Sequence, residues 1–449
     1  MEYFRAYSLS SDAGIVAAWD SVASAAEIPS LRQLIAARGA ELFPEFAKRY
    51  GEIRALPRSA RRALQRRLAQ SRELANIPAE WRRKLAYSIA GAALLLALGG
   101  AAHAGAIAVT AKTPPDVNAD GKCSLIEAIV NANNHATTYS DCPGATAGPN
   151  TIMLPKGSQI FKQSVANYGP ENLAVPSITS DITISGHGAK ITRAKGTPAF
   201  LFLHIATGGK LTLQDATVSG FAATASTAGA LYNGYRGSLI IENSVISGNT
   251  ASRAGAISNI GYLKITGSTL SKNSADTHAG AIYSYVNTTT IISNTLITGN
   301  TAGRFGGAIY SKYGHVYIDG STFLKNSVGS APGYAGGAIH SRHDYLKIDS
   351  SLLTTNRAPN GGAIYSINSA GLGVAVHIDG STLSKNAAGN NGGGVFNHGG
   401  SLVLTNSVVS GNKAGMAGGG VYNASPFTFI YTNDTFTKNK APSGPNYSP

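Results

Sequence analysis

The sequence predicts an all-β fold: a right-handed parallel β-helix (a solenoid) with an N-terminal capping helix, preceded by an α-helical leader region. Three observations support this. A repeat with a spacing of 24 to 30 residues runs through residues 208–440. Each repeat contains short runs in which apolar and polar residues alternate, and glycine, serine or asparagine separates these runs, which predicts coils of three short strands joined by tight turns. A helical pattern of about ten residues is missing from every repeat, so helical and leucine-rich repeats fit poorly.

One half of the repeat ends in an asparagine, as in Ser-Val-Ile-Ser-Gly-Asn at 244–249. Stacked coils place equivalent residues roughly 4.8 Å apart. Equivalent asparagines are therefore expected to form a structural ladder in which each side-chain amide bonds the next and satisfies polar groups at a buried turn. The ladder residues are Asn249, Asn273, Asn300, Asn326, Asn356, Asn386, Asn412 and Asn439.

The other half of the repeat is a glycine phrase such as Gly-Gly-Ala-Ile-Tyr-Ser at 306–311. Backbone crowding or a positive φ at a corner explains the glycines. The phrase Gly-Gly-Ala-Ile and the segment Phe-Leu-Lys-Asn at 323–326 resemble the repeats of the polymorphic outer membrane proteins, a family of bacterial surface β-helices. This resemblance implies a surface β-helix, and it implies no particular activity.

Residues 1–86 differ from the repeats and are expected to form a basic α-helical N-terminal extension. Segments 30–36 and 59–68 have the spacing of short amphipathic helices, rich in arginine and alanine. Such helices either lie on a membrane surface or bind a partner, or they are the solvated helices of a long leader.

Residues 87–104 form a hydrophobic signal or anchor segment. A basic stretch at 81–84 precedes an apolar run that ends in Ala102-His103-Ala104, which predicts cleavage after Ala104. Alternatively the run stays in the inner membrane as a transmembrane helix, for which its length of about 16 to 19 residues is borderline. Both interpretations bring the leader into contact with the inner membrane and place the β-helix outside it.

Residues 105–160 are expected to form the N-terminal cap of the β-helix. The stretch 123–129 has one apolar helical face, and Ser124 and Glu127 form a capping box. It resembles the CSLREA domain of exported bacterial β-helix proteins, with Ile126 where that motif has arginine. A helix laid over the first coil would cover an open sheet edge.

Cys123 and Cys142 are the only cysteines, and behind an export signal they predict one disulfide. Closing a loop of about 20 residues would contribute on the order of 3 kcal/mol. The stretch from Asp116 to Glu127 also matches an EF-hand loop, although Pro114-Pro115 excludes the usual entering helix. We predict no metal and no cofactor, and calcium binding remains the alternative.

Residues 161–449 hold the β-helix repeats. The chain has 53 glycines, but they are periodic and separated by aliphatic runs, which favours an ordered solenoid over disorder. The formal net charge is +14, and the basic residues are spread along the coils and are not gathered with aromatics. This distribution predicts no nucleic-acid partner and allows a weak attraction to anionic polysaccharide.

Three columns of equivalent residues carry functional groups. The acidic column, Asp319, Asp349 and Asp379, would suit a retaining glycosidase pair or a cation site, whereas ordinary turn residues are the simpler interpretation. A lysine column precedes ladder asparagines and is expected to discourage edge association: Lys272, Lys325, Lys385 and Lys438. An aromatic column would stack on sugar rings if it faces outward: Tyr232, Ser258, Tyr283, Tyr310, His340, Tyr365, Phe396 and Tyr422.

We assign no catalytic residue, since His340, His343 and Asp344 form the richest polar group and look like surface residues. We expect an exported bacterial protein, secreted or at the cell surface, with an adhesin-like or structural binding role. Its expected partners are glycans or components of a host or envelope surface. The alternative is a carbohydrate-active β-helix enzyme, either a polysaccharide lyase or a glycosidase.

Overall fold

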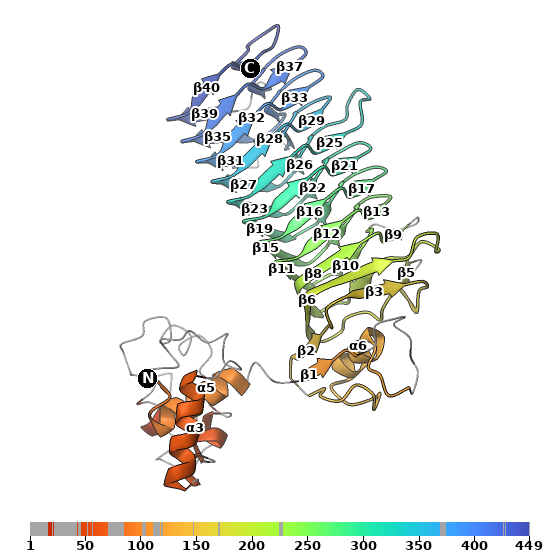
Figure 1. Cartoon of the computed structure of the whole chain (residues 1–449). Coiled ribbons are helices and arrows are strands. Elements are labelled where there is room, and N and C mark those ends of the chain that lie inside the picture. Colours follow the sequence, from red (N-terminus) through yellow and green to blue (C-terminus); the bar gives the residue numbers. More distant parts are fainter. Residues whose placement is uncertain are drawn as a thin grey trace. The chain divides into compact units, whose positions relative to one another are not determined.

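The computed structural model describes residues 105–448 except 111–116, 118–119, 147, 169–170, 224–227, 369–373, 425 and 427. Before residue 105 it describes 17–19, 21, 43, 46–51, 53–55, 57–70 and 85–100. The chain divides into two compact units, residues 1–104 and 105–449, which are treated separately below (Figure 1).

The N-terminal unit is helical and has an aromatic core. Trp19 packs edge-on against Phe43 and Phe46, with ring centroids 5.5 and 5.0 Å apart. Its two longer helices are α3 (Arg58–Gln70) and α5 (Ile89–Gly100). Arg58, Arg62 and Arg66 on α3 are solvent-exposed, as an amphipathic helix requires.

Helix α5 is the apolar run of the hydrophobic segment. Its residues Ala92 to Leu95 are fully buried within the N-terminal unit. None of the helices in the described residues is both long and apolar enough to cross a membrane. The expected cleavage position, after Ala104, lies outside the described residues.

The second unit is a parallel β-helix, which confirms the predicted fold class (Figure 1). Its coils stack so that each strand pairs in parallel with the equivalent strand of the next coil, for example Ile309 with Ile339 and Asp319 with Asp349. Within the described residues the strands form three long sheets, of 21, ten and eight strands, called sheets 1, 2 and 3 below.

Sheet 1 holds β1 (Ala106–Ala108), β2 (Asn150–Met153), β3 (Ser158–Phe161), β6 (Asp181–Arg193), β8 (Lys210–Ser219), β11 (Ser238–Glu242), β12 (Val245–Ser247), β15 (Tyr262–Thr266), β16 (Thr269–Ser271), β19 (Thr289–Ser293), β20 (Leu296–Thr298), β23 (His315–Asp319), β24 (Thr322–Leu324), β27 (Tyr345–Asp349), β28 (Leu352–Thr354), β31 (Val374–Asp379), β32 (Thr382–Ser384), β35 (Ser401–Thr405), β36 (Val408–Ser410), β39 (Phe429–Thr432) and β40 (Thr435–Thr437).

Sheet 2 holds β7 (Leu203–Ile205), β10 (Leu231–Asn233), β14 (Ile257–Asn259), β18 (Ile282–Tyr285), β22 (Ile309–Lys312), β26 (Ile339–Arg342), β30 (Ile364–Ile367), β34 (Val395–Asn397), β38 (Val421–Asn423) and β41 (Tyr447–Ser448). Sheet 3 holds β9 (Ala222–Ala223), β13 (Thr250–Ala251), β17 (Ser274–Ala275), β21 (Thr301–Ala302), β25 (Ser327–Val328), β29 (Arg357–Ala358), β33 (Ala387–Ala388) and β37 (Lys413–Ala414). A separate antiparallel pair consists of β4 (Ala166–Tyr168) and β5 (Glu171–Leu173).

A typical coil contains four short strands, one more than the sequence pattern suggests. The side formed by sheet 1 is divided in two by a residue with positive φ, such as Asn294 (+49°) or Gly320 (+55°). In the earlier coils the continuous strands β6 and β8 form the same side and contain the same bend, at His187 (+49°) and Asp215 (+51°). The left-handed residue bends the strand, because the chain cannot stay extended through it.

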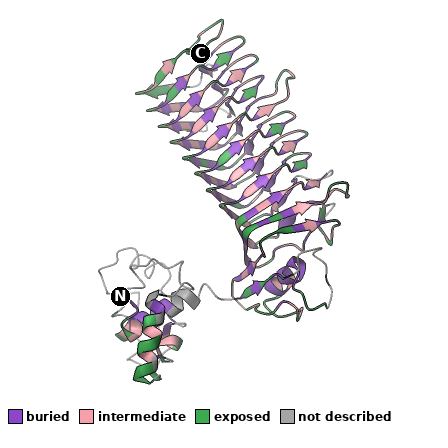
Figure 2. Cartoon of the chain, in the orientation of Figure 1, coloured by how far each residue is buried: buried purple, intermediate pink, exposed green. Residues whose placement is uncertain are grey.

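The core is a continuous column of aliphatic and aromatic side chains that runs through the coils, coloured purple in Figure 2. The glycine phrase lets the chain approach this column closely. At Gly307 an added Cβ would overlap the carbonyl oxygen of Gly337 in the next coil, so crowding excludes a side chain. The preceding Gly306 has φ +63°, which explains the first glycine of the pair.

The N-terminal end of the solenoid is covered by α6 (Leu125–Asn134), which buries its apolar face against the first coils. Ser124 and Glu127 form the capping box, since the Glu127 carboxylate accepts the Ser124 N–H at 2.9 Å. The predicted disulfide between Cys123 and Cys142 is present beside this helix.

Candidate functional site

The ladder asparagines lie fully buried along one edge of the β-helix, apart from a small exposed fraction at Asn439. From Asn273 onward, each Oδ1 accepts two hydrogen bonds from the preceding ladder residue. Asn356, for example, accepts from the backbone N–H and the side-chain amide of Asn326 at 2.9 and 3.1 Å. Its own amide donates to Asn386 and to the carbonyl of Phe323, both at 3.0 Å. These residues are committed to structure and are unavailable to a ligand.

A second polar ladder, formed by hydroxyls, was missed by the sequence analysis. It consists of Ser244, Ser268, Thr295, Ser321, Ser351, Ser381 and Ser407, each five residues before a ladder asparagine. Ser321 Oγ accepts from the N–H of Thr295 at 3.1 Å and donates to the carbonyl of Asp319 at 2.9 Å. The fixed spacing of five residues was the available signal.

The acidic column lies in register at the ends of three successive strands of sheet 1. Lys347 forms an ion pair with Asp349 at 2.6 Å. Asp379 accepts from the Thr405 hydroxyl and the Asn406 amide, and these hydrogen bonds hold the pKa of its carboxyl below the usual range. An acid–base pair in a glycosidase needs one carboxyl whose pKa is raised. The environment of Asp379 instead lowers the pKa of its carboxyl.

His340, His343 and Asp344 are not brought together in one site. His340 is buried in the aromatic column, and burial lowers the pKa of its imidazole to about 3. The ring of His343 stacks on Tyr313 at a corner of the coil. Asp344 points inward at that corner, accepts the N–H of Gly314, and is 4% exposed. Burial raises the pKa of Asp344 to about 7.

The aromatic column lies on the face of sheet 2 that is turned away from the core. Its rings pack against one another with centroid distances from 4.7 to 5.4 Å between Tyr283 and Tyr422; Tyr283 and Tyr310 are parallel, and the other pairs are tilted or edge-to-face. Tyr310 is 4% exposed, and Phe305 also packs against this cluster. Most of these ring faces are therefore covered by other rings and cannot stack on a sugar.

The four residues of the lysine column are exposed at turns, with φ between +54° and +57°.

Two residues of the EF-hand-like stretch, Asp116 and Asn118, lie outside the described residues. Glu127 is 1% exposed and is engaged in the capping box. Nowhere in the described part of the chain do three His, Cys, Asp or Glu side chains gather closely enough to hold a metal ion.

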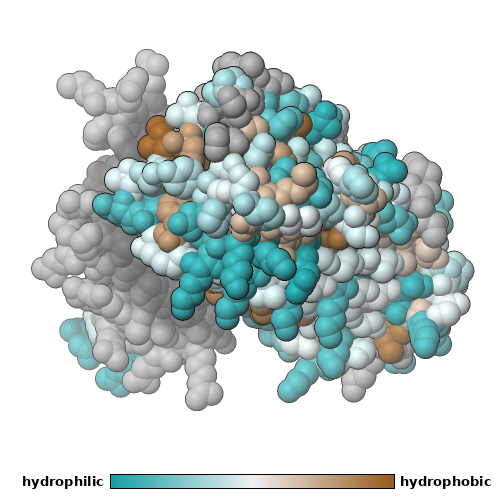
Figure 3. Space-filling view, turned by 90° about the horizontal axis from the view of Figure 1, so that it is seen from above, coloured by the Kyte–Doolittle hydropathy of each residue, from teal (hydrophilic) through white to brown (hydrophobic). Residues whose placement is uncertain are grey.

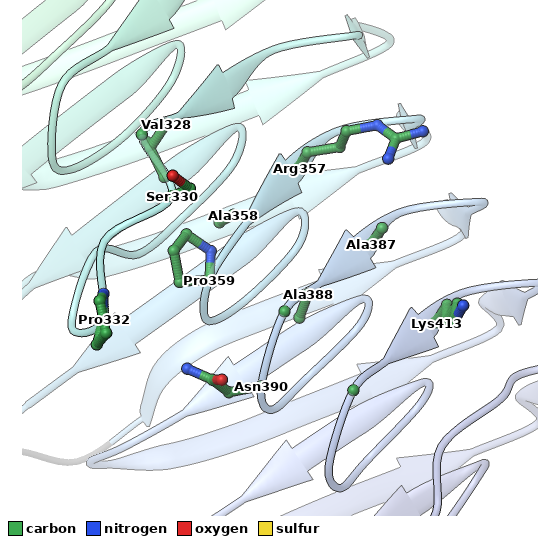
Figure 4. A pocket seen from close by; sticks show the side chains of 13 residues that line it. Val328, Ser330, Pro332, Arg357, Ala358, Pro359, Ala387, Ala388, Asn390 and Lys413 are labelled. Atoms are coloured by element: carbon green, nitrogen blue, oxygen red, sulfur yellow. The ribbon is translucent and has the colours of Figure 1, made fainter.

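A groove with a volume of about 510 Å³ runs across the outer face of sheet 3 (Figure 4). Its floor comes from β29, β33 and β37, and small residues such as Ala358 and Ala388 keep it open. The segment after β25, with Ser330 and Pro332, forms part of its wall. This segment, residues 328–335, is longer than the equivalent segments of the two neighbouring coils, residues 302–305 and 358–360.

The groove is basic. Arg357 and Lys413 are its charged lining residues, and both are exposed (Figure 4). The row of outward side chains continues in register from Arg357 through Ala387 and Lys413 to Lys440. In the preceding coils the same row holds Thr301 and Ser327, so positive charge is concentrated in the C-terminal coils. A row of cations without a carboxylate in the lining favours an extended anionic ligand.

The view in Figure 3 shows the hydropathy of one face of the molecule. On its described atoms, hydrophobic residues form small, separate areas among hydrophilic ones. A surface for an apolar partner needs a larger continuous patch. This face therefore suits polar ligands better.

Comparison with known proteins gives two findings. The Chlamydia polymorphic membrane protein repeat matches residues 294–312, which contain one ladder asparagine and one glycine pair. This match covers a single repeat and suggests an exported, cell-surface β-helix protein. No curated protein matches the chain.

Among solved structures, the catalytic unit of the thermostable GH87 alpha-1,3-glucanase from Streptomyces thermodiastaticus strain HF3-3 is similar to the chain. The identity is 15%, the TM-score is 0.41, and the match covers 75% of this chain and 70% of that one.

Proposed function

We propose that the chain is an exported β-helix protein that binds glycans at a cell or envelope surface and does not cleave them. The observation that carries the proposal is the basic groove, which is lined by Arg357 and Lys413 and whose row of outward residues continues to Lys440. The repeat match at 294–312 supports a surface location.

The test is binding of the full chain to polygalacturonate, an anionic polysaccharide, measured at several salt concentrations. Reversing both groove charges, Arg357→Glu with Lys413→Glu, should weaken binding at least tenfold at low salt. Binding by the wild type should fall as salt increases, because exposed charges are screened.

The matched control is Lys190→Glu with Lys195→Glu, which makes the same change in net charge at exposed positions outside the groove. This control should bind as the wild type does. Equal weakening in both double variants would show that binding depends on net charge alone and not on the groove.

The alternative function, a lyase or glycosidase, is favoured only by the register of the acidic column. If it is correct, Asp349→Asn abolishes release of new chain ends from a polysaccharide that the wild type cleaves. We expect no cleavage by either protein, since Asp349 is paired with Lys347 and Asp379 is held ionised. Reducing-end and unsaturated-product assays on the same polysaccharides distinguish the two functions.

A further inference from the structure

A second exposed surface lies on two neighbouring coils, outside the basic groove. We define the aromatic face as Tyr313, His315, Tyr317, His343 and Tyr345. Tyr313 and Tyr317 are 44% and 37% exposed, and His315 is exposed as well. The face begins at the corners that precede β23 and β27 and continues on the outer side of these strands, where His315 pairs with Tyr345.

The rings of the aromatic face are held in place by one another. Tyr313 and His343 stack with centroids 5.1 Å apart and planes 11° apart. The ring of Tyr345 packs against the rings of His315 and Tyr317, with centroids 6.3 and 5.9 Å apart. A surface whose side chains are already ordered loses little conformational entropy when a ligand binds.

The backbone at this corner is unusual for aromatic residues. Tyr313 and His343 have φ of +59° and +54°. The preceding coil has Val286 in the same place, with φ +54°, because its N–H bonds the Lys312 carbonyl just as the Tyr313 N–H bonds that of Arg342. Residues other than glycine rarely adopt a positive φ, and in two successive coils the residue held in this conformation is a large ring, which indicates a role for the rings beyond folding.

The charges around the aromatic face are balanced. Lys312 lies 4.8 Å from the ring of Tyr313, and Lys347 is neutralised by Asp349. Asp319 is exposed beside Tyr317, and a carboxylate of this kind accepts hydrogen bonds from hydroxyl groups. Flat rings beside acceptors match the C–H faces and hydroxyls of an uncharged sugar.

We propose that the aromatic face binds an uncharged polysaccharide, with Tyr313 and Tyr317 stacked on pyranose rings and Asp319 accepting hydroxyl hydrogen bonds. This inference rests on the proposed glycan-binding function and adds a second site with different specificity. The basic groove takes acidic polymers, and the aromatic face takes neutral ones.

The experiment compares three full-length proteins by affinity electrophoresis in gels that contain dextran, laminarin, xyloglucan or polygalacturonate. The test variant is Tyr313→Asn with Tyr317→Ile. Asparagine tolerates the positive φ of Tyr313, and isoleucine copies Ile291 of the preceding coil, so the fold is preserved. The control is Tyr262→Thr, which removes a tyrosine 37% exposed on an earlier coil and copies Thr289.

We expect at least one neutral polysaccharide to retard the wild type and the control. The test variant should bind it at least tenfold more weakly, while polygalacturonate binding stays unchanged. Retardation by polygalacturonate alone would overturn the aromatic site and leave the groove function standing. Equal binding of neutral polysaccharide by all three proteins would also overturn it. A single-stranded oligothymidylate that binds more tightly than any neutral polysaccharide, and whose binding depends on Tyr313, would assign the face to nucleic acid instead.

Discussion

Asp344 is a buried acid at a corner that other coils fill with neutral groups. The equivalent residues in the two preceding coils are Thr288 and Gly314. Burial raises the pKa of Asp344 from the ordinary 3.8 to about 7. Between these values the folded chain binds more protons than the unfolded chain, so this group makes stability fall as the pH rises through that window.

Replacing Asp344 by asparagine should remove this pH-dependent penalty. We expect Asp344→Asn to be more stable than the wild type at pH 8 by about 3 kcal/mol, and the difference to shrink toward zero near pH 4. Urea unfolding at pH 4, 6 and 8 measures it. A difference that is the same at all three values would contradict a buried, titrating carboxyl.

His340→Gln is the matched comparison, because burial lowers the pKa of His340 and so changes the pH dependence of stability in the opposite direction. Burial lowers the pKa of His340 to about 3, so its contribution to stability is lost as the pH falls below 6.5. Relative to the wild type, His340→Gln should therefore gain stability toward acid pH, whereas Asp344→Asn gains it toward alkaline pH.

At the scale of one element, the asparagine ladder joins each coil to the next, because its side chains repeat the same hydrogen bonds from coil to coil. Removing the Asn356 side chain would leave the N–H and the amide of Asn326 and the carbonyl of Phe323 buried without these partners. Each such group costs about 1–3 kcal/mol.

We therefore expect Asn356→Ala to lower the free energy of unfolding by at least about 3 kcal/mol. Asn172→Ala, at an exposed strand position, should change it by less than about 0.5 kcal/mol. Denaturant unfolding of both variants provides the comparison. A loss for Asn356→Ala as small as that of the surface control would show that the ladder contributes little to stability.

The sequence indicates the β-helix, the capping box and the disulfide because each has a local pattern: a fixed repeat, a serine three residues before a glutamate, and two cysteines. The fourth strand of each coil was missed because different residues occupy the bend, among them Asn294, Gly320 and Ser350. The inward direction of Asp344 was missed for a similar reason. It becomes visible only when Gly314 is known to be its neighbour.

At the scale of the whole β-helix, the three sides of each coil carry different chemistry. Sheet 2 covers its outer face with stacked rings, sheet 3 carries the basic groove, and sheet 1 carries the aromatic face and the acidic column. Sequence alone could not find the groove, because Arg357, Lys413 and Lys440 belong to different repeats and share no motif. Only the register of the coils, which vary in length, brings them into one row.

The central claim is that this β-helix functions outside the inner membrane. The most direct test is to express the full chain in a Gram-negative host, fractionate the cells, and sequence the N-terminus of the mature protein. We predict a start at or near Gly105, in the outer-membrane fraction or the medium. An intact N-terminus in the cytoplasm would contradict export. An intact N-terminus in the inner membrane would contradict a released surface protein and make residues 1–86 the cytoplasmic part of a membrane-anchored β-helix.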